Sequence, residues 1–368
     1  MLDRKLLFIQ STFGDAHQMV RFFELKKHYR EAQLLAFSRM YYESTKEVNF
    51  INLGKVRHGH LFSRILVYFN ALKIISSQQS DDRPSDIYFF GFDLLPWLAL
   101  SRRFKRSRLI FEIPDVRDKF FQKTLMTNLM KWFFKSSIKF VSAVVVTSEL
   151  FHSRFLRVNG IQPKHWFLLE NKVHLTDNEL KPKLQNREIV IGYFGLLRCE
   201  RSLLVLKELV DKSENFKVVI HGYFMNISED LQSAIINHSK ISYKGTYKSP
   251  QDLSEIYSQI DVSWVAYPFH DPQEEGNFRY AWTNRYYEAG FFGIPMIGNA
   301  HSGDAEKIIR NNFGMILDLS DITKAVNDLS KLDKEIIQEW REALSKTPVS
   351  EFMSTDEDYK PLIKYLQS

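Results

Sequence analysis

One guanidinium and one carboxylate stand three residues apart in the apolar and aromatic stretch NRYYEAGFFGIPMIGN, residues 284–299. On a helix, Arg285 and Glu288 would be neighbours on one face. Thr283 or Asn284 could cap that helix, and a cation at its amino end is unfavourable unless an anion is bound there. The cation and the capped end could bind a diphosphate, and the carboxylate could accept hydrogen bonds from a vicinal diol such as a ribose. The alternative is an Arg–Glu pair on the surface.

A second candidate anion site is GYFGLLRCER, residues 192–201. A strand ends there in glycines, and we expect a helix to begin near Ser202. Backbone amides at glycines can approach an anion, a helix amino end adds a favourable dipole, and Arg198 or Arg201 can bind phosphate oxygens in a bidentate way. The alternative is a tight turn with surface arginines. The stretch is not GxGxxG, and no GxxxxGK[ST] loop occurs, so neither a dehydrogenase fingerprint nor a P-loop is present.

The first half of the chain offers a carboxylate at the end of a strand. FEIPDVRD, residues 111–118, places Asp115 at the carboxyl end of a predicted strand. A carboxylate there could act as an acid or base, or orient a substrate hydroxyl, and the alternative is a cap for the following helix. His17, three residues after Gly14 in the loop that follows the first predicted strand, is a second candidate for acid–base catalysis. A surface histidine is the simpler interpretation.

No metal site is expected. Residues 356–358, Asp-Glu-Asp, have the DxD form but lie in a polar tail, where they read as a solvated helix cap. His58 and His60 flank a glycine without an evident third ligand.

These residues must be positioned by an alternation of strands and helices. Continuous apolar runs of strand length are typical of parallel sheets that are buried on both faces. Alternating β and α units imply a doubly wound α/β fold. The alternation breaks at the polar stretch HLTDNELKPKLQNRE, residues 174–188, and restarts at EIVIGYFG. We therefore predict two Rossmann-like domains that face across a cleft, with ligands at the carboxyl ends of strands.

The length of 368 residues favours two domains over one. We expect an N-terminal domain at 1–175, a C-terminal domain at 186–345, and a tail helix at 346–368 that packs toward the first domain. A single cysteine, Cys199, excludes an internal disulfide and fits a reducing compartment. With neither a signal peptide nor a membrane span expected, the predicted location is the cytoplasm.

The basic charge is concentrated in one segment. Residues 101–140 hold eleven Lys and Arg against three acids, while the net charge of the whole chain is +6. Residues 117–140 mix Lys with Phe, Trp, Leu and Met, which is the composition of an amphipathic helix on an anionic membrane. The alternative is a half-buried helix with a solvated basic face. Because no nucleic-acid-binding module is evident, nucleic acid is not an expected partner.

The stretch 284–297, NRYYEAGFFGIPMI, resembles glycosyltransferase family 4 of the GT-B fold, whose pattern is Asn-Lys/Arg, two residues, Glu-Ala, then Gly-x-Pro-Val/Ile. IGYFGLLRCERSLLVL is similar to the first strand and basic loop of that family's second domain. YKGTYKSPQDLSEIYSQIDV is similar to its glycine turn, helix and Asp-strand block. TFGD, VVVTSELF and LLENKV in the first half fit more loosely.

The resemblance implies a retaining enzyme that moves a sugar from a nucleotide diphosphate donor, linked to UDP or GDP, without a cofactor or metal. The acceptor would be a hydroxyl of a glycan or a lipid-linked glycan in surface polysaccharide synthesis, and the enzyme could lie peripherally at the inner face of the membrane. The implied donor ligands are the phosphate-loop residues Gly195, Arg198 and Arg201; Asn284, Arg285 and Glu288; and Gly14, Gly222, Gly245 and Tyr247.

One position departs from the family pattern. Many members have a first Glu eight residues before the second, and here that position is Tyr280. Glu274 and Glu275 are nearby but out of register, and Asn277 is a weaker substitute. Two other functions therefore stay open: a sugar-nucleotide epimerase of the same fold, and a non-catalytic nucleotide-sugar-binding or scaffold subunit.

Overall fold

The structure, a computed structural model, describes residues 1–38, 48–56, 61–79, 84–101, 104, 106–174, 187–269, 271 and 273–368. The chain forms two compact units. The first comprises Met1–Glu170 together with Asp356–Ser368, and the second comprises Asn171–Thr355. The histidines at 58 and 60, and most of the polar stretch after residue 174, lie outside the described residues.

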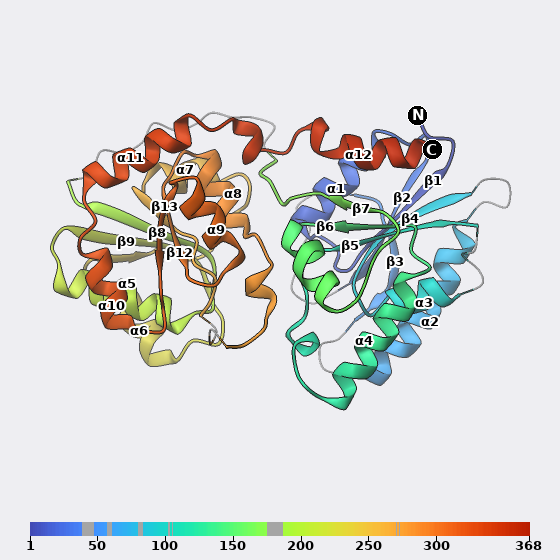
Figure 1. The fold of residues 1–368 in the computed structure, drawn as a ribbon, viewed down its shortest axis with the longest axis horizontal. Helices are drawn as coiled ribbons and strands as arrows, with labels where there is room; N and C mark the ends of the chain where they lie inside the picture. The colour runs from blue at the N-terminus through green and yellow to red at the C-terminus, as the bar shows by residue number, and fades with distance from the viewer. Residues whose placement is uncertain are drawn as a thin grey trace. The chain divides into compact units, whose positions relative to one another are not determined.

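The first unit is built on a parallel sheet of seven strands in the order β3-β2-β1-β4-β5-β6-β7 (Figure 1). β1 and β4 are buried along their whole length, as the apolar sequence predicts. The strands are β1 (Lys5–Gln10), β2 (Ala32–Ser38), β3 (Ile51–Lys55), β4 (Ser85–Phe90), β5 (Arg108–Ile113), β6 (Ala143–Val146) and β7 (Trp166–Leu168).

Helices cover both faces of this sheet. Side chains of α1 and α12 share one apolar core with the sheet, and α3 packs against both α2 and α4. Right-handed crossovers place α2, α3 and α4 together on the other face. The helices are α1 (Ala16–Lys26), α2 (Leu61–Ser77), α3 (Leu95–Leu100), α4 (Leu125–Ile138) and α12 (Asp356–Gln367), with short 3-10 and π turns at Asp118–Phe120 and Phe151–Leu156.

A buried polar network fixes α12 to the first unit. Arg21 forms an ion pair with Glu112 at 3.1 Å, and both side chains are buried. The same guanidinium donates to the Tyr359 hydroxyl of α12 at 2.8 Å and to the Leu169 carbonyl at 2.8 Å. Because every charge in this network is paired, its burial is tolerated, whereas removal of one partner would cost about 3–5 kcal/mol.

The second unit has a parallel sheet of six strands in the order β10-β9-β8-β11-β12-β13. One core lies between the sheet and α5, α6, α10 and part of α11, and another packs α7, α8 and α9. The strands are β8 (Ile189–Leu197), β9 (Phe216–Phe224), β10 (Ile241–Tyr243), β11 (Val262–Trp264), β12 (Met296–Asn299) and β13 (Gly314–Leu317). The helices are α5 (Glu200–Lys212), α6 (Glu229–Ile236), α7 (Leu253–Ser258), α8 (Asn284–Phe291), α9 (Gly303–Arg310), α10 (Ile322–Leu329) and α11 (Lys334–Ser345).

The predicted fold class, two doubly wound parallel sheets with a C-terminal helix that returns to the first unit, is confirmed. One local expectation was wrong. The basic helix covers only 125–138 of the expected 117–140, because Thr124 caps it by accepting from the amide of Thr127 at 3.1 Å. α5 begins at Glu200, near the expected Ser202, with the Cys199 sulfur as its cap.

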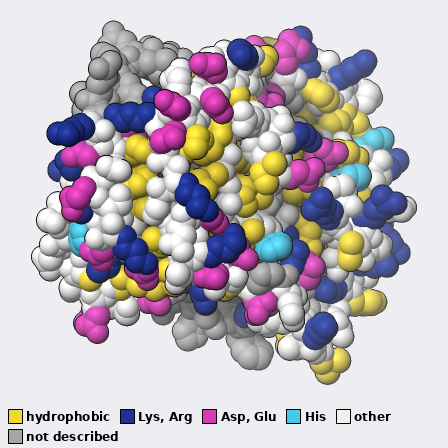
Figure 2. Space-filling view, turned by 60° about the vertical axis from the view of Figure 1, so that its left-hand side comes forward, with side chains coloured by type: hydrophobic (Ala, Val, Ile, Leu, Met, Phe, Trp, Pro, Cys, Tyr) yellow, Lys and Arg dark blue, Asp and Glu magenta, His cyan; other side chains and the backbone are white. Residues whose placement is uncertain are grey.

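On the face of the molecule drawn in Figure 2, Lys and Arg side chains are interspersed with Asp and Glu. This even mixture contrasts with the one-sided charge that the sequence places after β5.

Candidate functional site

Three glycines come together toward the carboxyl ends of β8 and β9. Gly195 and Gly222 are paired across the two strands, with φ angles of 98° and 144°. The amide of Gly222 donates to the carbonyl of Gly245 at 2.7 Å. A Cβ atom at Gly222 would lie 1.7 Å from the carbonyl oxygen of Gly195, so only glycine fits there. The three predicted glycines therefore form one side-chain-free edge where a ligand could approach the backbone.

Tyr247 connects this edge with α8. A Cβ atom at Gly195 would lie 3.8 Å from the Tyr247 hydroxyl. Burial raises the pKa of Tyr247, the negative charge of Glu288 raises it further, and the positive charge of Arg285 acts against the rise. The hydroxyl thus lies within electrostatic range of both charged residues predicted from the opening stretch.

The amino end of α8 is held in place by two side chains. Thr283 caps the helix by accepting from the amide of Tyr286 at 3.3 Å, so Thr283 is the cap and Asn284 is the first helical residue. The amide of Thr283 in turn donates to the carboxylate of Asp304 at 3.0 Å. Burial raises the pKa of Asp304 to about 6. A capped helix end of this kind favours an anion.

Arg285 and Arg198 both lie near the buried hydroxyl of Tyr193. The Arg285 guanidinium lies 5.3 Å from the ring centroid of Tyr193 and donates to the Trp264 carbonyl at 3.5 Å. Arg198 is exposed and donates to the Tyr267 hydroxyl at 3.3 Å. Burial raises the pKa of Tyr193, and the charges of Arg285 and Arg198 act against that rise. Two cations therefore gather next to the end of β8, where the sequence predicted an anion site.

Glu288 is a half-buried carboxylate one turn into α8. Burial raises its pKa, while a hydrogen bond from Tyr257 and the charge of Arg285 act against the rise. The Tyr257 hydroxyl donates to Oε2 at 3.0 Å. In the part of the chain that the structure describes, Arg285 and Glu288 form no ion pair, so the alternative of a surface Arg–Glu pair is wrong. A carboxylate can accept about four hydrogen bonds, which leaves capacity for a ligand.

Arg201 lies apart from these groups. Its guanidinium donates to the carbonyls of Leu319 and Ser320 at 2.9 Å each and stacks 4.4 Å from the ring centroid of Phe269. These contacts hold the turn after β13, so the geometry gives Arg201 a structural task. Its predicted contact with phosphate stays a prediction.

The position that departs from the family pattern is occupied by a paired tyrosine. Tyr280 is buried and donates its hydroxyl proton to Glu275 at 2.6 Å. Asn277 donates to the Tyr267 hydroxyl at 3.3 Å, the same oxygen that Arg198 contacts. Asn277 is thereby brought next to Arg198, and Glu275 is held by the residue that replaces the first Glu.

Sequence reasoning missed two residues of this site. Tyr267 binds both Arg198 and Asn277, and Asp304 positions the cap of α8. Each follows a buried strand, in the stretches SWVAYP and MIGNAHSGD. Polar groups that directly follow a buried strand of a parallel sheet lie at its ligand-binding edge, and that signal could have pointed to both.

The predicted residues of the first unit lie in its loops. Gly14 has a φ of 87° in the turn between β1 and α1, where Asp15 caps the helix by accepting from the amide of Gln18 at 3.0 Å. His17 is exposed. Asp115 is exposed after β5, and the cap position of the following turn is Arg117. The Asp115 side chain is therefore not the cap that the alternative interpretation required.

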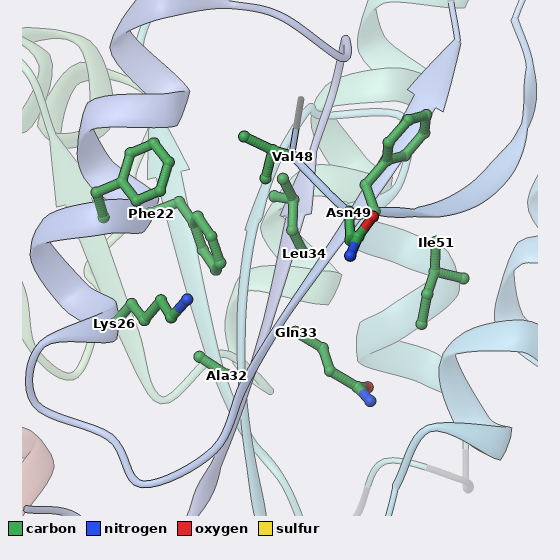
Figure 3. Close-up of a pocket in the computed structure, with 10 residues that line it drawn as sticks. Phe22, Lys26, Ala32, Gln33, Leu34, Val48, Asn49 and Ile51 are labelled. Carbon is green, nitrogen blue, oxygen red and sulfur yellow. The ribbon is translucent and has the colours of Figure 1, made fainter. Parts of the chain in front are cut away.

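A hollow of about 840 Å³ in the first unit is separate from all these residues. Figure 3 shows Phe22 and Lys26 of α1 on one side and Leu34 and Val48 on the other. None of the predicted site residues lines it. Among the described residues, no group of three or more His, Cys, Asp and Glu could hold a metal ion. No described helix is long and apolar enough to cross a bilayer.

Comparisons with known proteins support one architecture. No protein-family model matches the chain. Succinoglycan biosynthesis protein ExoL of Rhizobium meliloti (strain 1021) is 24% identical over 332 residues, which cover 86% of this chain and 81% of that protein.

Among solved structures, the sucrose-phosphate synthase of Thermosynechococcus elongatus matches with a TM-score of 0.69 at 14% identity, covering 99% of this chain and 97% of that chain. Anabaena HepE in complex with UDP matches with a TM-score of 0.69 at 12% identity, covering 98% and 99%. WaaG, a glycosyltransferase involved in lipopolysaccharide biosynthesis, matches with a TM-score of 0.67 at 12% identity, covering 97% and 99%. At these identities the likeness shows the fold, and the chain has the GT-B architecture that its sequence predicted.

Proposed function

We propose that this protein is a glycosyltransferase that moves a sugar from a nucleotide diphosphate donor to a hydroxyl of a glycan or lipid-linked glycan in polysaccharide synthesis. The observation that carries the proposal is the convergence of Arg198, Arg285, Glu288 and the three-glycine edge in the second unit. ExoL is named as a succinoglycan biosynthesis protein, and HepE was solved with UDP, with UDP and glucose, and with UDP-glucose. These matches favour a UDP-linked donor.

Each group has a task in this function. Arg198, Arg285 and the amino end of α8 would stabilise the negative charge that develops on the leaving diphosphate. Glu288 would accept hydrogen bonds from the ribose hydroxyls. The edge formed by Gly195, Gly222 and Gly245, with Tyr247 beside it, would let the base and phosphates approach the backbone. Gly14 would lie under the sugar phosphate.

The finer assignment is to a retaining enzyme of glycosyltransferase family 4 that needs no metal. The pattern of Asn284 to Pro295 supports the family. Two arginines and a helix end would supply the positive charge that a metal ion could otherwise provide to the diphosphate. Asp115 is the proposed residue that orients the acceptor hydroxyl from the first unit.

The alternative of a non-catalytic nucleotide-sugar-binding subunit has one observation in its favour, the Tyr280–Glu275 pair in place of the first Glu. A single assay separates it from the proposal and from an epimerase. The protein is incubated with UDP-glucose and a lipid-linked glycan acceptor, and all products are identified. Transfer supports a transferase, an epimerised nucleotide sugar indicates the epimerase, and binding of UDP without turnover indicates the subunit. Calorimetric titration with UDP and GDP tests the site itself, and failure of both to bind would overturn the proposal.

A further inference from the structure

The outer face of α4 is apolar. The exposed side chains are large and hydrophobic, up to 87% exposed for Leu125 and 60% for Trp132. Scattered exposed apolar residues are ordinary on a protein surface, but a contiguous group marks a binding surface. We call this group the α4 stripe, and it consists of Leu125, Met126, Leu129, Trp132 and Phe133.

The orientation of α4 is fixed by its opposite face. The stripe repeats at intervals of one, three and four residues, which places its members on one side of a helix. Phe134 on the other side is buried, and its ring packs against those of Phe92, Phe111 and Phe120 at centroid distances of 5.0, 6.3 and 5.9 Å. Rotation of the helix to bury the stripe would expose this aromatic cluster. The stripe is therefore held outward by the core beneath it.

α2 extends the apolar surface. Its exposed side chains include Ile65, Leu66 and Phe69, with Leu66 70% exposed. α3 packs against both α2 and α4, and Leu100 at its end is also exposed. Because the three helices lie side by side on one face of the sheet, their outer faces point away from it together.

The charge along the sequence of α4 and the residues that follow it has one sign. Between Asp118 and Glu149 the sequence contains no acid. The same interval carries five lysines: Lys119, Lys123, Lys131, Lys135 and Lys139. A surface that is both apolar and basic requires a partner that is both apolar and acidic.

We propose that the outer faces of α4 and α2 dock onto an anionic lipid bilayer. Trp and Phe side chains suit the interface between headgroups and acyl chains, and lysines bind anionic headgroups. A nucleic acid would use the lysines but has no use for an apolar stripe. A protein interface is depleted in lysine, so a second copy of the chain fits less well. The inference does not depend on the proposed function, because binding to lipid needs neither donor nor acceptor.

Cosedimentation of the full-length protein with vesicles tests the inference. Vesicles of phosphatidylcholine alone are compared with vesicles that contain phosphatidylglycerol, at low and high salt and without nucleotide. We expect binding to the anionic vesicles that weakens with salt. Each lysine near the surface contributes about fivefold to partitioning. The variant K131Q/K135Q/K139Q should therefore bind roughly a hundredfold more weakly, and L129S/W132S should lose binding without losing its fold.

Two controls keep the result interpretable. K324Q/K331Q changes exposed lysines of the second unit and should bind vesicles as the unaltered protein does. Thermal unfolding of every variant shows whether it folds. The inference is overturned if anionic and neutral vesicles bind equally, or if both α4 variants bind as the unaltered protein does. It is also overturned if the protein dimerises through Trp132 and Leu129 and does not bind vesicles. If the unaltered protein failed to bind UDP or GDP in separate titrations, the proposed function would fail but the vesicle-binding result would still stand.

Discussion

Replacing Glu288 with glutamine separates the function of this carboxylate from its effect on stability. Glutamine keeps the shape and can still accept the hydrogen bond that Tyr257 donates at 3.0 Å. It removes the negative charge of the carboxylate, which we propose binds the ribose hydroxyls. A hydrogen bond to a charged group contributes about 1.5–3 kcal/mol. E288Q should therefore weaken nucleotide binding and transfer by roughly ten- to 150-fold.

The stability of the same variant should move the other way. Burial raises the pKa of Glu288 in the folded protein above its ordinary value. The folded state then binds the proton more tightly than the unfolded chain, so the free energy of unfolding falls as the pH rises through the interval between the two pKa values. At neutral pH the ionised carboxylate destabilises the fold. E288Q should accordingly show an unchanged or higher Tm.

The ribose contact can be tested directly with a ligand that lacks one hydroxyl. Calorimetry would compare UDP with 2′-deoxy-UDP on the unaltered protein and on E288Q. We expect the unaltered protein to prefer UDP and E288Q to show a clearly smaller preference, which gives a coupling energy between the charge of the side chain and the hydroxyl. If E288Q still preferred UDP by the original factor, the carboxylate would not contact that hydroxyl and the reasoning would be refuted.

Asp261 supplies the matched control. Burial raises its pKa too, but it accepts from the Val190 amide at 2.9 Å and from Arg341 at 3.0 Å. D261N should lower the Tm because it breaks the ion pair with Arg341. It should leave the preference for UDP unchanged.

Three further predictions concern the same unit. G222A should destabilise the fold by at least about 3 kcal/mol in urea unfolding, because a Cβ atom would collide with the Gly195 carbonyl. R285A should weaken UDP binding about 30-fold in calorimetry at a nearly unchanged Tm, since a charge-assisted contact of about 2 kcal/mol is lost. D304N removes a carboxyl whose pKa burial raises to about 6. The stability of D304N relative to the unaltered protein should therefore rise between about pH 4 and 7, by about 3 kcal/mol at most in pH-dependent thermal melts.

Local features of the site could be predicted from the sequence. The cap at Thr283, the shared face of Arg285 and Glu288, and the glycines at strand ends depend on residues a few positions apart. Backbone geometry alone relates such positions. The buried strands were equally accessible, because their apolar runs are continuous.

Contacts between distant residues could not be predicted in the same way. The bond from Arg198 to Tyr267 spans 69 residues, and the bond from Thr283 to Asp304 spans 21. Both depend on the strand order β8-β11-β12, which brings three strand ends to one edge. No local sequence pattern predicts that strand order. The extent of α4 was missed for a different reason, since the composition of 117–140 is uniform while a single capping threonine sets the start of the helix.

The buried carboxylates of the chain show why Glu288 points to a ligand. Glu112 is paired with Arg21, and Asp261 is paired with Arg341. Each of these charges is compensated inside the described structure. Glu288 receives a neutral hydroxyl, and Arg285 beside it forms no ion pair with it in that same part of the chain. A half-buried charge that is compensated this weakly destabilises the fold, and donors from a bound ligand would supply the compensation that the chain does not.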